Sequence, residues 1–263
     1  MDGRVEMFVF SGTGNSLLVA RRVAEGLRGG GVVVRLHHLE TADSAAVPAG
    51  EAGVTLGLAF PVAAFSTYPL VWRFIETLPP GNGTPVFMLA TMGGFSGLLF
   101  GPMKQLLSSK GYRPLAACGL RMPSNYLIGV RPPEKCQKRL ESGLRGADAF
   151  ALDLLAGRAR WRRFSPVPYA WVRWFWARAA RSFARDGLRF RANPAACTRC
   201  GICERLCPIR NIFQPAPGAL PEWGGSCQMC QRCVAFCPAR AISGPRHATG
   251  AYRAVEAGEF LGG

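Results

Sequence analysis

Eight of the ten cysteines fall in two runs that share one spacing, C-x2-C-x2-C-x3-C-P. The first run places cysteines at Cys197, Cys200, Cys203 and Cys207, and the second at Cys227, Cys230, Cys233 and Cys237. Such a density of thiols in a chain that we expect to be cytoplasmic predicts metal ligation, because the cytosol keeps thiols reduced and disfavours disulfides.

The spacing within each run predicts the metal. Two-residue gaps let three thiolates surround one corner of a 4Fe–4S cubane, and the fourth, displaced by a short turn and a proline, reaches the other cluster. We therefore expect two 4Fe–4S clusters, one held by Cys197, Cys200, Cys203 and Cys237, the other by Cys227, Cys230, Cys233 and Cys207. The alternative is two zinc sites built from CxxC pairs, but this doubled run is not a zinc-ribbon spacing.

Five arginines lie within a few residues of the cysteines: Arg199, Arg205, Arg210, Arg232 and Arg240. Positive charge close to a cluster favours its reduced, more negative state. We therefore expect potentials above those of an acidic ferredoxin.

A second chemistry is expected near the N-terminus, where the segment VFSGTGNS joins an apolar strand to a helix. Backbone N–H groups and hydroxyls of such a turn converge on one point, so they can hold a phosphate without Lys or Arg. The turn is not a Walker A motif, since no lysine follows its last glycine, and an ordinary strand-to-helix turn is the alternative. The predicted phosphate ligands are Ser11, Thr13, Gly14, Asn15 and Ser16.

Two further loops, 60–66 and 91–97, follow later strands and are expected at the same edge of the sheet. One phosphate pocket beside two loops with glycine and aromatic residues suits a mononucleotide with a flat ring, which is FMN. The cofactor-binding candidates in these loops are Pro61, Val62, Ala63, Phe65, Thr91, Met92, Gly93, Gly94, Phe95 and Gly97.

The elements that must position these loops alternate along the chain. Apolar runs predict strands at 4–10, 32–39, 54–60, 85–91 and 115–122, and periodic segments predict helices at 16–28, 68–78, 97–110 and 133–155. This alternation is typical of an α/β domain with a doubly wound, five-stranded parallel sheet. Residues 40–53 are too few for a full helix, so we expect an abbreviated crossover there.

The chain is expected to divide into a domain at 1–157, a basic, Trp-rich helical linker at 158–191, a cluster domain at 192–246 and a frayed tail at 247–263. In the linker, Val172, Trp176, Ala179 and Phe183 share one helical face. That face could pack on the first domain. Alternatively, residues 169–185 could bind an anionic membrane or dock an acidic redox partner.

The net charge is +16, with 32 Lys and Arg against 16 Asp and Glu, which favours an anionic partner. Nucleic acid is disfavoured because the chain has no recognised binding motif. No apolar run is long enough to span a bilayer and no signal peptide is recognisable, so we expect a cytoplasmic protein with membrane association through the linker left open. No catalytic constellation emerges from the three histidines.

Residues 1–155 resemble a flavodoxin-like domain, with Ser16 in place of the usual Thr of the phosphate loop. The whole order of motifs is similar to the fused flavodoxin–ferredoxin proteins of anaerobic bacteria and archaea, as are the segments FPV at 60–62, MPSNY at 122–126 and PEWG at 221–224. The resemblance implies the strand order 2-1-3-4-5, a bacterial ferredoxin-type α+β cluster domain, and FMN contacts from Asn125 and Tyr126. Relatives commonly carry an aromatic residue where this chain has Ala63, so Phe65 or Tyr126 would have to stack on the flavin.

These motifs predict an electron-transfer iron–sulfur flavoprotein that passes electrons between two clusters and FMN, and on to an acidic redox partner. The alternative is an FMN-dependent oxidoreductase that acts on a small, lipid-soluble substrate of the quinone or porphyrinogen type. In that case the clusters would carry electrons to or from the FMN.

Overall fold

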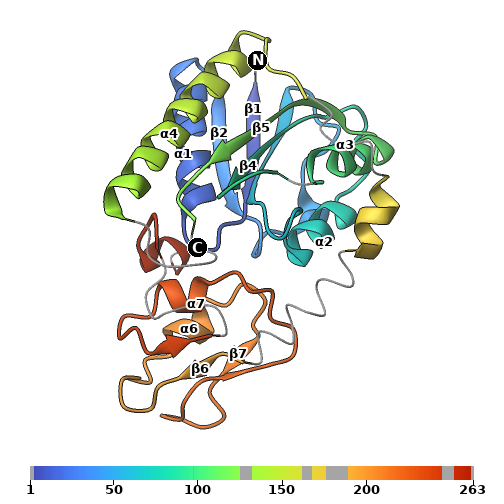
Figure 1. The fold of residues 1–263 in the computed structure, drawn as a ribbon. Coiled ribbons are helices and arrows are strands. Elements are labelled where there is room, and N and C mark those ends of the chain that lie inside the picture. The colour runs from blue at the N-terminus through green and yellow to red at the C-terminus, as the bar shows by residue number, and fades with distance from the viewer. Residues whose placement is uncertain are drawn as a thin grey trace.

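The computed structural model describes residues 3–96, 98–124, 132–161, 168–175, 189–244 and 252–261. Figure 1 shows an α/β domain with helices on both faces of a sheet and, below it, a smaller part built from residues 190–244. We call this smaller part the cysteine module. It lies at the edge of the sheet where the strands end, which is where ligands bind in doubly wound folds.

The sheet is parallel throughout and has the strand order β2-β1-β3-β4-β5. Its strands are β1 (Arg4–Val9), β2 (Val33–His38), β3 (Val54–Pro61), β4 (Pro85–Met92) and β5 (Arg113–Arg121). Almost every residue of β3 and β4 is buried, as expected for central strands covered on both faces. This is the flavodoxin-like order, and it confirms the α/β part of the predicted fold class, while the ferredoxin-type fold of the second domain stays a prediction.

Four helices cover the sheet: α1 (Asn15–Gly29), α2 (Pro69–Thr77), α3 (Phe100–Ser109) and α4 (Pro133–Leu155). Helices α1 and α4 lie on one face, and α2 and α3 on the other (Figure 1). Between β2 and β3 the chain makes only a short 3-10 turn, η1 (Ser44–Ala46), which confirms the abbreviated crossover.

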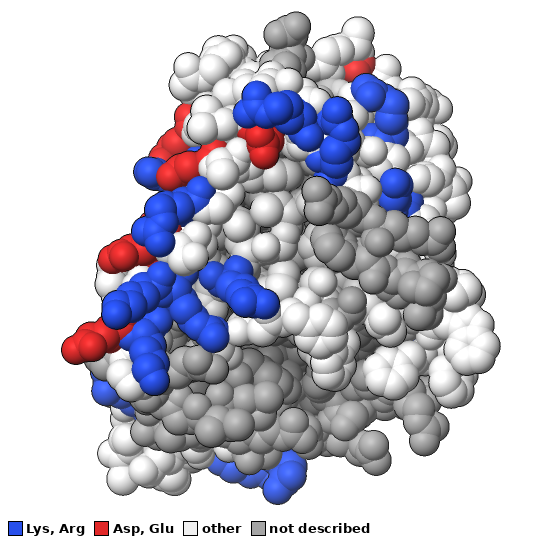
Figure 2. Space-filling view, turned by 45° about the horizontal axis from the view of Figure 1, so that its top comes forward, with Lys and Arg blue, Asp and Glu red and all other residues white. Residues whose placement is uncertain are grey.

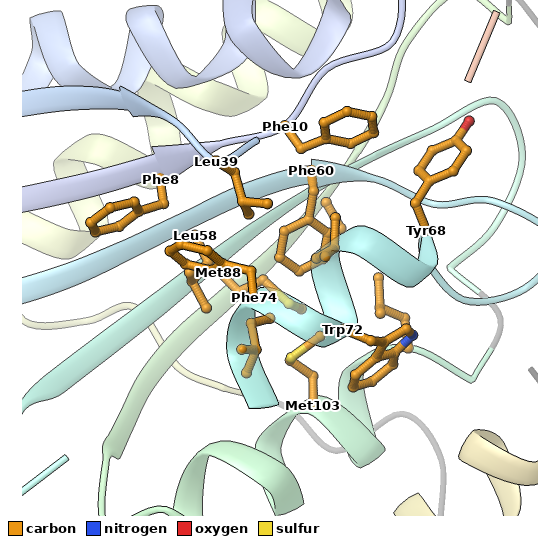
Figure 3. Packing of buried hydrophobic residues seen from close by; sticks show 14 of the residues in the cluster. Phe8, Phe10, Leu39, Leu58, Phe60, Tyr68, Trp72, Phe74, Met88 and Met103 are labelled. Atoms are coloured by element: carbon orange, nitrogen blue, oxygen red, sulfur yellow. The ribbon is translucent and has the colours of Figure 1, made fainter. Parts of the chain in front are cut away.

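The core on the α2 and α3 face continues into the cysteine module. Figure 3 shows strand side chains such as Phe60 meeting Trp72 and Phe74 of α2. The same buried cluster includes Trp223 and Met229, which belong to the cysteine module. The two parts therefore share one hydrophobic core, which fixes the module against the strand ends.

The cysteine module has two similar halves. Two short helices, α6 (Ile202–Arg205) and α7 (Arg232–Ala235), lie within the two cysteine runs. In the described part of the module, four two-residue strands form two antiparallel pairs: β6 (Arg191–Ala192) with β9 (Ile242–Ser243), and β7 (Ile212–Phe213) with β8 (Glu222–Trp223). The backbone is left-handed at equivalent places of both runs, as at Arg199 and Met229 or Arg210 and Arg240. The internal repeat seen in the sequence is thus a repeat of backbone conformation.

Residues 252–261 correct one prediction, because they are packed rather than frayed. Ala254 N donates a hydrogen bond to Thr13 O at 2.8 Å, and Glu259 forms an ion pair with Arg21. The segment ends in a 3-10 turn, η2 (Ala257–Phe260), whose Phe260 ring lies 5.3 Å from that of Phe236. Two apolar side chains, Val255 and Phe260, supply the burial that a short polar tail would lack.

Residues 169–175 are helical and form the beginning of the basic, Trp-rich segment (yellow helix in Figure 1). Val172 is buried, and both Tyr169 and Arg173 bind Glu76 of α2. The first turns therefore pack on the α/β domain through the predicted apolar face. The other residues of that face, Trp176, Ala179 and Phe183, lie outside the described part of the chain.

Part of the positive charge is paired on the surface of the α/β domain. Figure 2 shows Asp and Glu side chains among the Lys and Arg side chains at the left of the molecule. Arg22 of α1 lies 2.6 Å from Asp148 of α4, and Arg158, just after α4, lies 3.0 Å from Asp153 near the end of that helix. Over the described residues, no helix combines the length and apolarity that a membrane span requires.

Candidate functional site

An open pocket of about 670 Å³ lies where the strands of the α/β domain end against the cysteine module. Its wall includes ten of the predicted cofactor-binding residues: Ser11, Thr13, Asn15, Ser16, Pro61, Val62, Ala63, Thr91, Met92 and Gly93. These come from the turn after β1 and from the loops after β3 and β4, which the parallel register brings to one edge.

Four predicted residues lie outside the wall. Gly14, Phe65, Gly94 and Phe95 belong to the same loops but do not line the pocket, while Gly97, Asn125 and Tyr126 lie outside the described residues. The wall also contains residues that were not predicted as ligands: Gly12, Ala64, Tyr68, Met122, Pro123, Ser124, Gln228 and Met229. Gln228 and Met229 lie between Cys227 and Cys230 of the second run. Nothing in the sequence indicates that this segment reaches the pocket of the α/β domain.

The turn after β1 is shaped to hold an anion. Gly14 is left-handed, with a φ of 101°, and its N–H donates a hydrogen bond to Ser11 Oγ at 3.1 Å. Ser16 Oγ lies 2.7 Å from Thr91 Oγ1, which joins the first turn of α1 to the end of β4. The N-terminus of α1 opens into this turn, so its partial positive charge is available to a phosphate.

Asn15 supplies a buried acceptor in the pocket wall. Its Nδ2 donates to Pro123 O at 2.8 Å, while its Oδ1 is buried and has no hydrogen-bond partner among the described residues. A buried acceptor of this kind costs free energy unless a donor reaches it. The pocket therefore favours a ligand that carries hydroxyl groups as well as an anion.

A strained turn borders the pocket after β3. Ala63 and Ser66 exchange two backbone hydrogen bonds of 2.9 Å, and the residues between them, Ala64 and Phe65, have φ values of 42° and 68°. This is a two-residue turn of a type that normally carries Asn or Gly, so two side chains here store strain. The turn holds Phe65 out beside Phe95, with ring centroids 5.6 Å apart and both side chains exposed.

Two arginines fix the loop after β4. Arg139 of α4 donates to Gly93 O at 2.7 Å, and Arg121 of β5 donates to Gly94 O at 3.1 Å. On the opposite side, Tyr68 packs edge-on against Phe10 at 5.3 Å. The pocket is therefore held open by contacts that come from several elements.

The eight cysteines of the two runs line two separate cavities. One, of about 360 Å³, is lined by Cys197, Cys200, Cys203 and Cys237, and we call it the distal cavity. The other, of about 390 Å³, is lined by Cys207, Cys227, Cys230 and Cys233, and we call it the proximal cavity. Each cavity takes three cysteines from one run and one from the other, the grouping that the spacing predicts.

Sulfur atoms of the runs accept hydrogen bonds from backbone N–H groups at equivalent places. Asn211 N donates to Cys207 Sγ at 3.2 Å, and Ala241 N donates to Cys237 Sγ at 3.3 Å. Donors of this kind stabilise thiolate ligands and tune cluster potentials. Among the described residues, no three His, Cys, Asp or Glu side chains converge as they would around a single metal ion. Instead, the cysteines of the two runs line the proximal and distal cavities.

Burial makes these thiols poor acids. It raises the pKa of Cys203 to about 11 and that of Cys230 to about 12. Buried neutral thiols lose their protons when they bind a metal, so any metal binding by these thiols would release protons. Cys118, outside the runs, lies in β5, where burial raises its pKa to about 11 as for an inert core thiol.

The pocket and the proximal cavity share a wall. Gln228 and Met229 line both, and no residue of the distal cavity lines the pocket. At the same boundary a Cβ on Gly12 would lie 2.2 Å from Cys230 O, so the turn after β1 touches the second cysteine run backbone to backbone. A group in the pocket and a group in the proximal cavity would be neighbours.

No protein-family model matches the chain, and a search of the curated proteins finds no match. Among solved structures, it is similar to the flavodoxin of Megasphaera elsdenii, at 21% identity over 54% of this chain and 98% of that one, with a TM-score of 0.40. It is also similar to an NAD(P)H:quinone oxidoreductase from Methanothermobacter marburgensis, at 15% identity over 58% and 96% of the chains, with a TM-score of 0.42. A Streptococcus pneumonia flavodoxin aligns at 16% identity over 57% and 98%, with a TM-score of 0.39.

Proposed function

We propose that this chain is an electron-transfer iron–sulfur flavoprotein, with FMN in the pocket and one 4Fe–4S cluster in each cysteine cavity. The observation that carries the proposal is the wall of Gln228 and Met229, which belongs to both the pocket and the proximal cavity. Two redox cofactors separated by one layer of side chains can exchange electrons directly.

The pocket suits FMN in its donor groups and in its shape. The turn after β1 and the α1 N-terminus would hold the phosphate, and the unpartnered Asn15 Oδ1 would accept from a ribityl hydroxyl. The loops after β3 and β4 would flank the ring, and Phe65 and Phe95 lie at the ends of those loops. Phe65, proposed from the sequence as a substitute for the aromatic residue missing at Ala63, follows Ala64 of the pocket wall and is itself exposed.

The two cavities suit 4Fe–4S clusters rather than single ions. Each is lined by four cysteines and by an apolar neighbour, Trp223 in the proximal cavity and Ile242 in the distal cavity. Backbone N–H groups directed at Cys207 and Cys237 would support thiolate ligands. Zinc would require four sulfurs to converge on one centre.

When bound, FMN exchanges up to two electrons and each cluster exchanges one, so together they join two-electron and one-electron chemistry. The chain itself sets the order of the sites. The pocket adjoins the proximal cavity, whereas the distal cavity carries the exposed Cys200. We therefore place the distal site toward an external redox partner and the flavin at the inner end.

The partner surface is proposed to lie around Cys200. Arg199, Arg205 and Arg240 are exposed there, and none of them forms an ion pair with another described residue. Unpaired surface arginines steer an acidic protein toward the distal site.

A second function is favoured by one observation. Trp171, Trp174 and Phe175 are 69%, 67% and 51% exposed at the start of the basic segment. Aromatic and basic residues at one surface suit binding to an anionic membrane. In this alternative the protein is an oxidoreductase that reduces a lipid-soluble quinone or porphyrinogen at the FMN.

Anaerobic purification with iron, sulfide and flavin analysis tests the main proposal. We expect about eight irons per chain, the content of two cubanes, and one FMN. Two zinc ions per chain, or an absence of flavin, would rule it out. Liposome co-sedimentation and quinone turnover separate the two functions, since electron exchange with an acidic redox protein alone favours the first.

A further inference from the structure

One buried arginine joins the two proposed cofactor sites. Arg232 lies between Cys230 and Cys233 in the second run and is 3% exposed. Its guanidinium donates to Ser11 O in the turn after β1 at 2.7 Å and forms an ion pair with Glu40 at 2.6 Å. A side chain from the lining of the proximal cavity therefore holds the turn that would carry the FMN phosphate.

Aromatic rings enclose this guanidinium. It lies 4.2 Å from the centre of the Phe260 ring and 5.6 Å from that of Phe10. Phe260 belongs to the packed C-terminal segment, which also contacts the turn after β1 through Ala254 and Val255. The position of the arginine is thus fixed from the sheet, the cysteine module and the C-terminal segment together.

Burying the ion pair of Arg232 and Glu40 costs free energy, because both charged groups lose their contact with water. Arg232 Nε and Glu40 Oε2 are both buried without hydrogen-bond partners among the described residues. A buried, partly satisfied ion pair is weak evidence for stability, since apolar residues of similar volume often do as well. What the pair supplies is a directed contact to Ser11 O, which an apolar residue cannot make.

The equivalent position of the first cysteine run shows what the module itself needs. There, Ile202 begins α6 as Arg232 begins α7, and Ile202 packs against the cluster of Leu206, Ala235 and Phe236. An aliphatic residue therefore suffices at this position of a cysteine run. The arginine occurs in the run that meets the turn after β1.

We propose that Arg232 is a positioning residue that couples the FMN phosphate turn to the proximal cluster, so that loading of one cofactor strengthens binding of the other. This inference rests on the proposed function. When the proximal cysteines wrap their cluster, α7 is fixed, the guanidinium is held in place, and the turn after β1 is held in its binding shape. Because coupling between two binding sites is reciprocal, bound FMN must strengthen binding of the proximal cluster by the same factor.

The test compares FMN affinity, measured by quenching of FMN fluorescence, in cluster-loaded and chelator-treated full-length protein. We expect cluster loading to tighten FMN binding about tenfold, within the usual range of coupling between sites. The variant Arg232→Met combined with Glu40→Gln removes both charges, so that neither is left buried alone. In it the ratio of affinities should fall to about one.

Arg205→Met is the matched control, because Arg205 is an exposed arginine of the first run. It should keep the tenfold ratio. A second readout is iron release to a chelator, which bound FMN should slow in the wild type and the control but not in the double variant. A ratio of one in the wild type, or an unchanged ratio in the double variant, overturns the coupling. Failure of the wild type to bind FMN or to incorporate iron would instead remove the proposed function, and the inference with it.

Discussion

The two cysteine runs have the same spacing but different surroundings. The first run lies at the outer side of the module, with Cys200 and Arg199 exposed. The second run lies on the side of the module that faces the α/β domain, and its residues Met229 and Arg232 are almost completely buried. Equivalent backbone positions carry Arg199 in one run and Met229 in the other, both left-handed.

This difference shows how a repeated motif acquires two roles. The cysteine spacing and the left-handed backbone positions are common to both runs, as the proposed 4Fe–4S clusters would require. The residues between the cysteines differ, because one run faces solvent and the other faces a pocket. If the proposed function holds, the outer site exchanges electrons with a partner and the inner site exchanges them with FMN.

We expect the largest effect from replacing one proposed cluster ligand in each cavity, Cys200 in the distal cavity and Cys230 in the proximal cavity. Cys200→Ala and Cys230→Ala should each lower the iron content from about eight to about four per chain. Only Cys230→Ala should also weaken FMN binding and stop electron exchange between the remaining cluster and the flavin. Iron and flavin analysis with stopped-flow spectroscopy measures this, and equal flavin loss in both variants would contradict the inner and outer assignment.

We expect the second largest effect on stability from exchanging the residues at the equivalent positions 199 and 229 of the two runs. Met229→Arg places a charge at a side chain that is 1% exposed and lines the pocket, so we expect about 3 kcal/mol or more of destabilisation and loss of FMN. The reciprocal change, Arg199→Met, alters an exposed residue and should cost less than about 0.5 kcal/mol. Chemical denaturation compares them, and similar losses in both would mean that the runs are equally buried.

Gly12→Ala tests the close approach of the inner run to the turn after β1. The added Cβ would meet Cys230 O at 2.2 Å, so backbone must move. We expect a loss of about 1–3 kcal/mol and weaker FMN binding. Gly94→Ala is the control, since its Cβ would meet no atom within 4 Å. If both variants melt at the wild-type temperature, the two parts do not touch as described.

The smallest effect concerns the outer surface. Replacing Arg199, Arg205 and Arg240 with Gln should slow association with an acidic redox protein several-fold at low salt and flatten its dependence on ionic strength. Electron exchange between the clusters and FMN inside the chain should not change. Stopped-flow mixing at several salt concentrations measures both, and an unchanged salt dependence would place the partner elsewhere.

Local patterns were enough for most of the fold. Apolar runs and helical periodicity predict all five strands and four helices of the α/β domain to within a few residues. The exchange of Cys207 and Cys237 between the two cavities follows from the three-residue gap and the proline. Such features are readable because they depend on neighbours in the chain and on fixed backbone geometry.

Only the tertiary structure shows how these parts meet. No spacing rule connects Met229 to a pocket built after β1, or Arg232 to Ser11, because these contacts join residues far apart in the chain. The C-terminal segment was predicted to fray, and yet Val255 and Phe260 are partly buried against residues of the cysteine module. The sequence by itself determined the α/β fold class, the position of the glycine-rich turn after β1 and the grouping of the cysteines. The structure decided which cysteine run faces the pocket, because burial depends on the packing of whole elements.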